Sequence, residues 1–231
     1  MKIGIIGAME VEVSTLKEAM KVDRVVTKAG MNFYEGMLLA IPAVVVQCGV
    51  GKVNAAMCVQ ILADLFQVTH VLNTGVAGSL NADLDIGDIL VSEKAVQHDV
   101  DVSPLGYQLG KIPGFESREF DADKRMADAI IDACKRANPD VNIVKGRVVS
   151  GDQFISDNKV KEHLISEFQG DCAEMEGAAI AQASVLNGIP FAIVRAISDK
   201  ADGSAEMDYP TFESQAAVHC ANLVMEFVKS F

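Results

Sequence analysis

Short runs of consecutive apolar residues alternate along the chain with longer segments whose apolar residues recur at helical spacing. The apolar runs are rich in valine and isoleucine and predict buried strands over Lys2–Gly7, Ala43–Cys48, His70–Asn73, Ile89–Val91, Ile143–Val149 and Pro190–Ile197. The helical spacing predicts helices over Glu10–Met20, Lys52–Phe66, Asp121–Asn138, Asn158–Phe168, Glu176–Asn187 and Thr211–Val228. Because strands alternate with helices, the pattern predicts a layered α/β fold with a largely parallel sheet.

One stretch departs from this alternation. Phe33–Leu39 and Ala43–Cys48 are joined directly across Ala40, Ile41 and Pro42, which predicts a hairpin and therefore a mixed sheet. The chain contains no dividing linker rich in Pro, Gly or Ser, and no repeat. We expect a single domain over residues 1–231, an ordinary length for one α/β core.

Composition and charge narrow the possible ligands. Half of the residues are hydrophobic and 23% are charged, as in a globular protein. The formal net charge of −12 repels phosphate backbones and anionic lipids, so nucleic acid and membranes are poor partners. We expect a small ligand that is neutral or cationic.

Cysteine and histidine spacing argues against disulfides and metals. The cysteines are scattered, odd in number and without a C-x-x-C pair, which indicates reduced, mostly buried thiols: Cys48, Cys58, Cys134, Cys172 and Cys220. No metal site is expected, because none of the histidines has metal-ligand spacing: His70, His98, His163 and His219. The first apolar run is short and is followed by Glu10, so we expect no signal peptide or membrane span and a soluble, cytoplasmic protein.

Candidate chemistry gathers where the predicted strands end, which is where sheets of this class bind ligands. Each of these segments, expected to be loops, combines glycine or another small residue with a polar or acidic group: Gly7–Glu10, Gly49–Lys52, Asn73–Gly78, Ser150–Ile155, Glu174–Glu176 and Ser198–Asp199.

The segment Ala173–Ala179 places Glu174 and Glu176 one residue apart beside several small residues. In an extended segment these two side chains point to the same side. Two carboxylates there need a cationic or hydroxyl-rich partner, and a ribose diol is such a partner. A solvated acidic helix start is the alternative interpretation.

Two familiar phosphate-binding motifs are incomplete. Gly4 and Gly7 suggest a dinucleotide-binding turn, but the full G-x-G-x-x-G pattern is absent. Gly49–Lys52 resembles a phosphate loop, yet Val46 replaces its first glycine and Val53 replaces the residue that holds magnesium. A tight strand-to-helix turn explains the glycines of Gly49–Lys52 better.

Taken together, the motifs stand in the order and spacing of a known family: Gly4–Glu10, Asn73–Gly78, Ser150–Ile155, Glu174–Ala179 and Arg195–Asp199. On these motifs the chain resembles the bacterial 5′-methylthioadenosine/S-adenosylhomocysteine nucleosidases, nearly from end to end. The resemblance implies the nucleoside phosphorylase fold, a three-layer α/β/α domain around a twisted mixed sheet. It also implies cofactor-free hydrolysis of an adenine N-glycosidic bond in methionine salvage, with 5′-deoxyadenosine as a further substrate.

The resemblance assigns catalytic roles to two carboxyl groups. Asp199 corresponds to a general acid at N7 of adenine, and its position after an apolar strand favours a raised pKa through desolvation. A turn cap formed with Ser198 is the alternative role for this residue. Glu12 resembles the carboxylate that activates water, and the neighbouring Glu10 is better suited to a helix start.

The resemblance also implies a substrate-binding set. Glu176 would bind the ribose hydroxyls, and Arg195 would balance the carboxylates. The remaining implied residues are Glu174, Met175 and Met9 at the sugar, Phe154 and Ile155 at adenine, Ala77, Gly78 and Ser198 around them, and Tyr209 at the alkylthio group. For Phe154 alone, a core aromatic is the alternative. Val102, Leu105 and Pro113 resemble residues from a neighbouring subunit, which implies a homodimer that completes each site.

One residue departs from the family pattern. Val76 stands where the family has serine, and its side chain cannot donate a hydrogen bond. The loop also lacks the arginine that a phosphate site needs, which disfavours a purine nucleoside phosphorylase. Aminodeoxyfutalosine hydrolysis in menaquinone synthesis remains an alternative, as does a catalytically silent nucleoside-binding protein.

Overall fold

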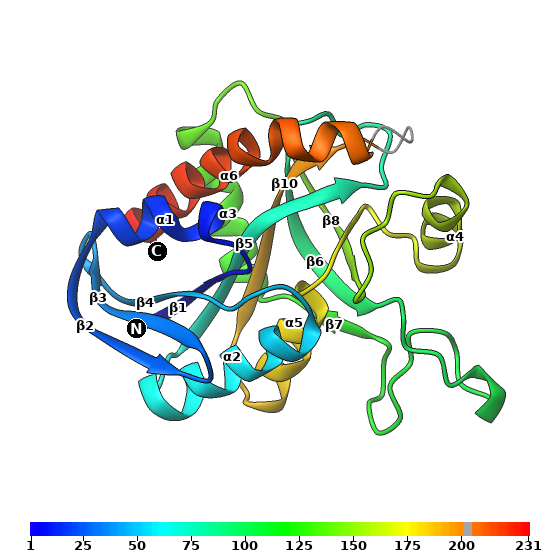
Figure 1. Cartoon of the computed structure of the whole chain (residues 1–231), viewed down its shortest axis with the longest axis horizontal. Coiled ribbons are helices and arrows are strands. Elements are labelled where there is room, and N and C mark those ends of the chain that lie inside the picture. Colours follow the sequence, from blue (N-terminus) through cyan, green and yellow to red (C-terminus); the bar gives the residue numbers. More distant parts are fainter. Residues whose placement is uncertain (201–204) are drawn as a thin grey trace.

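The computed structural model describes the backbone of residues 1–200 and 205–231, and the side chains of residues 1–200, 212 and 214–231 (Figure 1). Its strands are β1 Ile3–Gly7, β2 Met20–Lys28, β3 Met31–Leu38, β4 Ile41–Gln47, β5 His70–Ser79, β6 Ile89–Gln97, β7 Glu119–Asp121, β8 Ile143–Ser150, β9 Cys172–Glu174 and β10 Phe191–Asp199. Its helices are α1 Glu10–Ala19, α2 Lys52–Phe66, α3 Lys124–Ala137, α4 Asn158–Phe168, α5 Gly177–Leu186 and α6 Ala205–Ser230, with a short 3₁₀ helix, η1, over Ser103–Leu105.

The strands form one mixed sheet in the order β10-β6-β8-β9-β5-β1-β4-β3-β2, with β7 beside β6. Because β10 pairs with β5 as well as with β6, the strands β5, β10, β6, β8 and β9 close into a ring. β1 runs parallel to β4 and β5, whereas β3 and β4 form the expected antiparallel hairpin. The ring brings the ends of β5, β8, β9 and β10 close together.

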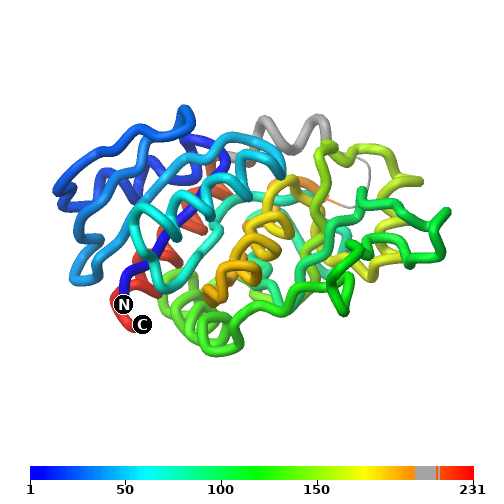
Figure 2. Tube along the Cα trace, turned by 90° about the horizontal axis from the view of Figure 1, so that it is seen from below, coloured from blue at the N-terminus to red at the C-terminus, as the bar shows by residue number. Residues whose placement is uncertain are grey.

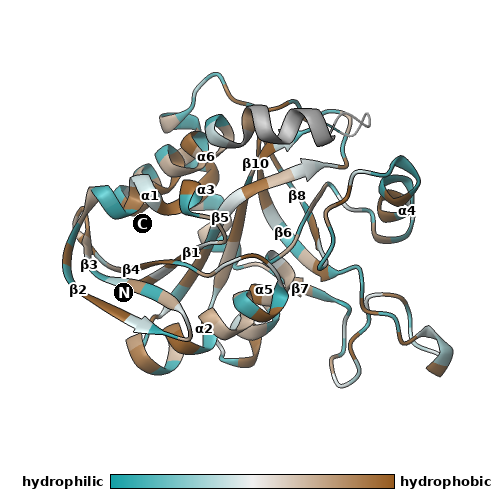
Figure 3. Cartoon of the chain, viewed as in Figure 1, coloured by the Kyte–Doolittle hydropathy of each residue, from teal (hydrophilic) through white to brown (hydrophobic). Residues whose placement is uncertain are grey.

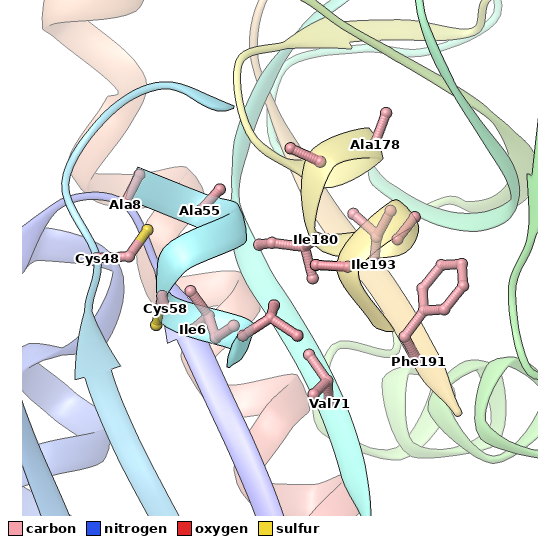
Figure 4. Packing of buried hydrophobic residues seen from close by; sticks show 14 of the residues in the cluster. Ile6, Ala8, Cys48, Ala55, Cys58, Val71, Ala178, Ile180, Phe191 and Ile193 are labelled. Atoms are coloured by element: carbon pink, nitrogen blue, oxygen red, sulfur yellow. The ribbon is translucent and has the colours of Figure 1, made fainter. Parts of the chain in front are cut away.

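Helices cover both faces of the sheet, because successive strand residues point to opposite sides. Ile5 and Leu72 pack with α1, α3 and α6 on one face. Ile6, Val71 and Ile193 pack with α2 and α5 on the other face (Figure 4). The three-layer α/β/α arrangement is thereby confirmed.

Two predicted loops are strands. Asn73–Gly78 lies inside β5, and Ser198–Asp199 ends β10. These residues continue the parallel pairing of β5 with β10, and this pairing keeps their backbone extended. The polar groups at this edge therefore project from paired strands instead of from connections.

Other boundaries differ more modestly. The helix predicted from Asp121 begins instead at Lys124, because Glu119–Asp121 pairs with β6 as β7. The strand β2 is absent from the sequence prediction, and most of its residues are exposed. It is an edge strand without a buried face to create an apolar pattern.

Residues 98–118, between β6 and β7, leave the sheet and project from the body of the molecule; we call them the projecting segment (Figures 1 and 2). All five cysteines are buried free thiols, as predicted. Within the described residues, no helix has the length and apolar character needed to cross a membrane.

Candidate active site

A cavity opens where the ring strands end, beside the turn between β1 and α1. Its lining residues come from that turn, from α1, β5, β9 and β10, and from the connections that follow β4, β8 and β9. They are Ala8, Met9, Glu12, Val50, Val76, Ala77, Gly78, Phe154, Ala173, Glu174, Met175, Glu176, Ser198 and Asp199.

Most residues of the predicted site share this cavity: Met9, Glu12, Ala77, Gly78, Phe154, Glu174, Met175, Glu176, Ser198 and Asp199. Ile155 is instead half-buried against the apolar cluster of α4, and Arg195 lies behind the lining. Val102, Leu105 and Pro113 lie on the projecting segment, away from this lining. The side chain of Tyr209 lies outside the described residues.

Glu12 is almost completely buried and is hydrogen-bonded to the backbone of the turn between β1 and α1 and to the backbone of β5. Its Oε2 accepts hydrogen bonds from the N–H groups of Ala8 (2.6 Å) and Met9 (2.9 Å), and its Oε1 accepts one from Val76 (3.1 Å). Residue 76 contacts Glu12 through its backbone N–H, so valine in place of the family's serine keeps this hydrogen bond. A Cβ at Gly75 would lie 2.3 Å from Oε1, so only glycine leaves room for the carboxylate.

Burial raises the pKa of Glu12, although the charge of Arg195 and the three backbone hydrogen bonds act in the opposite direction. A carboxylate whose pKa moves toward neutrality and which borders a cavity is suited to accept a proton from water.

Four protein groups donate hydrogen bonds to the carboxylate of Glu174. Its Oε2 accepts hydrogen bonds from Arg195 and from the N–H groups of Glu176 (3.1 Å) and Gly177 (2.8 Å). Its Oε1 accepts one from the hydroxyl of Ser150. These contacts tie the end of β8 and the start of α5 to β10, which gives Glu174 a structural task beside its place in the lining.

Glu176 sits at the start of α5 under different constraints. Within the described part of the chain its carboxylate accepts one hydrogen bond, from the N–H of Gly51 (2.8 Å). Burial and the neighbouring charge of Glu174 raise the pKa of Glu176 to about 7. Gly51 is the N-cap residue of α2, so the position of this carboxylate depends on where α2 begins.

Arg195 lies behind these glutamates and is 2% exposed. Its guanidinium donates to Asn73, to Glu174 and to the carbonyl of Val194. Burial opposes its charge, but the carboxylates of Glu174, Glu12 and Glu176 together raise its pKa above the ordinary value. It therefore remains a cation that offsets part of the charge of the glutamates.

Asp199 ends β10, is 2% exposed, and lies against β5. The hydroxyl of Ser198 is 2.9 Å from its Oδ1, and a Cβ at Gly78 would lie 2.7 Å from its Oδ2. The ammonium of Lys161, on α4, is 3.8 Å from Oδ2. The sequence analysis did not single out Lys161, although it shares a helix face with the buried Leu164, where a lysine is unusual.

A hydrogen-bonded clasp built on Lys52 holds the segment that carries Phe154. The Lys52 ammonium bonds Asp99 (2.6 Å) and Gln97 (3.0 Å), while its N–H donates to Asp152 (2.8 Å). The N–H of Asp152 donates in turn to Asp99 (3.0 Å). The clasp joins α2, the end of β6 and the segment before α4, and leaves Phe154 half-exposed at the cavity.

The lining residues that the predicted set omitted are small or apolar. Val50 lies in a glycine-flanked turn that the sequence does show, and Ala173 belongs to the motif of the paired glutamates. Ala8 and Val76 also lie within quoted motifs. Only the tertiary structure indicates which side chains in those motifs face inward.

Comparison with known proteins agrees with this fold and site. Residues 2–229 match the model of the phosphorylase superfamily, and the chain belongs to that superfamily. Among curated relatives, it is 40% identical to the 5′-methylthioadenosine/S-adenosylhomocysteine nucleosidase of Exiguobacterium, over 99% of this chain and 98% of that protein. The expected family is therefore confirmed.

Solved structures of nucleosidases and of a futalosine hydrolase have the same fold as this chain. The nucleosidase of Neisseria meningitidis in complex with methylthio-immucillin-A superposes with a TM-score of 0.95 at 35% identity, over 100% of this chain and 99% of that one. A futalosine hydrolase of Helicobacter pylori superposes with a TM-score of 0.94 at 33% identity, over 100% and 98% of the two chains.

Proposed function

We propose that this protein hydrolyses the N-glycosidic bond of 5′-methylthioadenosine and S-adenosylhomocysteine, and of 5′-deoxyadenosine, releasing adenine. The observation that carries the proposal is the convergence of three buried carboxyl groups, Glu12, Glu176 and Asp199, on one cavity. Nucleosidases that share 36–41% of the sequence support the substrate class.

The proposed reaction gives each carboxyl group one task. Asp199 donates a proton to N7 of adenine as the bond between C1′ and N9 breaks, so the base leaves neutral. Water adds to C1′ and passes a proton to Glu12, while Glu176 accepts hydrogen bonds from the ribose hydroxyls. The proton lost by Asp199 equals the proton gained by Glu12, so exchange with solvent restores the enzyme.

The charge of the lining favours water over phosphate as the nucleophile. Among the described residues that line the cavity, the charged ones are Glu12, Glu174, Glu176 and Asp199, and all are acidic. A phosphate dianion needs lysine, arginine or a set of free N–H donors. The N–H of Val76, one of the lining residues, already donates to Glu12.

A second substrate has structural support. The futalosine hydrolase of Helicobacter pylori superposes on this chain nearly as well as the nucleosidases do. We therefore include aminodeoxyfutalosine hydrolysis, which uses the same bond cleavage on a larger 5′ substituent, as the alternative activity.

We further propose that the protein acts in the cytoplasm as a homodimer whose partner completes the alkylthio pocket. Buried free thiols suit a reducing compartment. Leu105 is 75% exposed in η1 of the projecting segment, and Val53 is 74% exposed on α2. Both elements lie in the lower part of the view in Figure 1, and parts of α2 itself are hydrophobic (Figure 3). Exposed apolar surface of this kind typifies a protein interface.

The dimer is tested by light scattering with two interface variants. Leu105→Asp and Val53→Asp should each give a monomer with reduced activity, because a charge disrupts an apolar interface. Val218→Asp is the control, since Val218 is also exposed (50%) but lies on α6, in the opposite layer. Dimers that persist in both interface variants would contradict this assembly.

The activity is tested by incubating the purified protein with 5′-methylthioadenosine in phosphate-free buffer and again with phosphate. We expect free adenine and 5-methylthioribose in both. Adenine that appears only with phosphate would make the protein a phosphorylase. Release from aminodeoxyfutalosine alone would favour the alternative substrate, and binding without release would indicate a silent binding protein.

A further inference from the structure

Lys161 is a buried cation that the proposed mechanism leaves unused. It is 2% exposed and lies on α4, whose first turn is fixed by Asp157 accepting hydrogen bonds from the N–H groups of Lys159 (2.8 Å) and Val160 (3.1 Å). Its ammonium donates to the carbonyl of Lys200 (2.6 Å) and lies 3.8 Å from Oδ2 of Asp199. A lysine at this depth is rare unless its charge is compensated.

We propose that Lys161 is a positioning residue that sets the acidity of Asp199 and stabilises its carboxylate after the proton has moved to adenine. The inference rests on the proposed function, in which Asp199 is the general acid. At 3.8 Å the ammonium acts on Asp199 by charge, while its hydrogen bond to Lys200 fixes its place at the end of β10.

The surroundings of Asp199 make this cation important. From β10 itself it faces Ser198 and is followed by Lys200, whose ammonium pairs with Asp85 (2.5 Å). From β5 it meets the backbone of Gly78.

Among the residues whose side chains the structure describes, further titratable groups near Asp199 lie on β9, at the start of α5 and on α1. They are the Cys172 thiol, whose pKa burial holds well above its usual value, and the carboxyl groups of Glu174, Glu176 and Glu12, which line the same cavity. Burial and these carboxylates all oppose a negative charge on Asp199, and Lys161 favours it.

The proton transfer therefore depends on two opposing effects on the Asp199 carboxyl group: burial disfavours its ionised form, and the charge of Lys161 favours it. As a general acid, Asp199 must carry its proton before the reaction. When the C1′–N9 bond breaks, the electron pair of that bond goes to the base and the Asp199 proton goes to N7. The new carboxylate then lies 3.8 Å from the Lys161 ammonium, whose charge stabilises the transition state with a partly transferred proton.

The test compares two substrates and three substitutions at Lys161. Lys161→Met removes the charge, Lys161→Gln removes the charge but keeps a hydrogen-bond donor for Lys200, and Lys161→Arg keeps the charge. One substrate is 5′-methylthioadenosine, whose leaving group needs a proton. The other is the 4-nitrophenyl glycoside of 5-methylthioribose, whose phenolate leaves unprotonated. Lys159→Met, at an exposed position of the same helix, is the control.

We expect Lys161→Met and Lys161→Gln to lower kcat for 5′-methylthioadenosine by about tenfold, which is less than the about 10²–10⁴-fold of a lost general acid because Asp199 itself remains. The alkaline limb of their kcat/KM profile should move to higher pH by about 1–3 units, because an opposite charge at this distance lowers an aspartate pKa by that amount. Turnover of the nitrophenyl glycoside should stay unchanged, and Lys161→Arg should restore both kcat and the profile.

Three results would overturn the inference: an alkaline limb that does not move, equal losses on both substrates, or no rescue by arginine. Equal losses would assign Lys161 a purely structural role. If Lys161→Met does not fold, the glutamine variant carries the same comparison. Failure of the proposed function is separate, because it would appear as absence of adenine release by the unaltered protein.

Discussion

Two groups of buried charged side chains meet at the cavity, and they differ in how their charge is balanced. The glutamate group consists of Glu12, Glu174, Glu176 and Arg195, with one cation for three carboxylates. The aspartate pair consists of Asp199 and Lys161, with one cation for one carboxylate. In the glutamate group the cation is hydrogen-bonded to a carboxylate, whereas in the aspartate pair it stands 3.8 Å away.

The difference matches the two charges that develop when a glycosidic bond breaks. The sugar becomes cationic, and an excess of fixed negative charge nearby stabilises it. The base needs one proton, and a carboxyl group whose anion is compensated can supply it. In the proposed reaction, buried carboxyl groups therefore serve two tasks, and the number and distance of the cations beside them separate the two.

The largest expected effect comes from removing the acid of the aspartate pair. Asp199→Asn keeps the shape of the side chain but cannot donate the proton, so kcat for 5′-methylthioadenosine should fall by about 10²–10⁴-fold. The nitrophenyl glycoside should be spared. Glu12→Gln is the matched change in the glutamate group and should slow both substrates, because both need the activated water. A loss below about tenfold for Asp199→Asn would remove Asp199 from the acid role.

The next effect is on stability, in the glutamate group. Arg195→Met leaves Glu174 buried without its cation, and breaking a buried pair costs about 3–5 kcal/mol of unfolding free energy. Urea unfolding of the variant measures this loss. The double variant with Glu174→Gln should recover part of it, since both charges are then gone. A double variant as unstable as Arg195→Met would show that packing, and not charge, explains the loss.

Each charged group also depends on one glycine of β5, which gives a matched pair of variants. An added Cβ would lie 2.3 Å from the Glu12 carboxylate at Gly75 and 2.7 Å from the Asp199 carboxylate at Gly78. Displacing a catalytic group by about 1 Å can reduce the rate about 10²-fold. Gly75→Ala should therefore slow both substrates, and Gly78→Ala should slow only 5′-methylthioadenosine. The same loss pattern in both variants would mean that they distort β5 as a whole.

Much of this site is visible in the sequence because its residues are clustered in short motifs. Glu174 and Glu176 stand in one motif, and Ser198 and Asp199 in another, so a resemblance identifies them together. The alternation of apolar runs and helical segments likewise predicts the layers. Local patterns suffice where the side chains that act together also lie together along the chain.

The sequence does not show relations between distant segments. Lys161 reaches Asp199 from another element, and Glu176 depends on the N–H of Gly51. Ring closure between β10 and β5, which turns the expected loop Asn73–Gly78 into strand, is likewise a long-range pairing. Such contacts follow from the folded topology, so no local periodicity indicates them.

The smallest effect expected is a pH dependence of substrate binding that arises in the glutamate group. Because the pKa of Glu176 is raised to about 7, its carboxylate is ionised above that pH and protonated below it. Only the ionised form accepts hydrogen bonds from both ribose hydroxyls, so KM for 5′-methylthioadenosine should rise as the pH falls below 7. The limiting slope is about tenfold per pH unit, as for a single titrating group.

Two controls separate Glu176 from the aspartate pair. Inhibition by adenine, which has no ribose, should not follow the same curve. Glu176→Gln should abolish the pH dependence of KM while raising KM throughout, because an amide does not titrate. If KM of that variant still rose with the unaltered midpoint, the titrating group would lie elsewhere, and the uncompensated charge of the glutamate group would not control ribose binding.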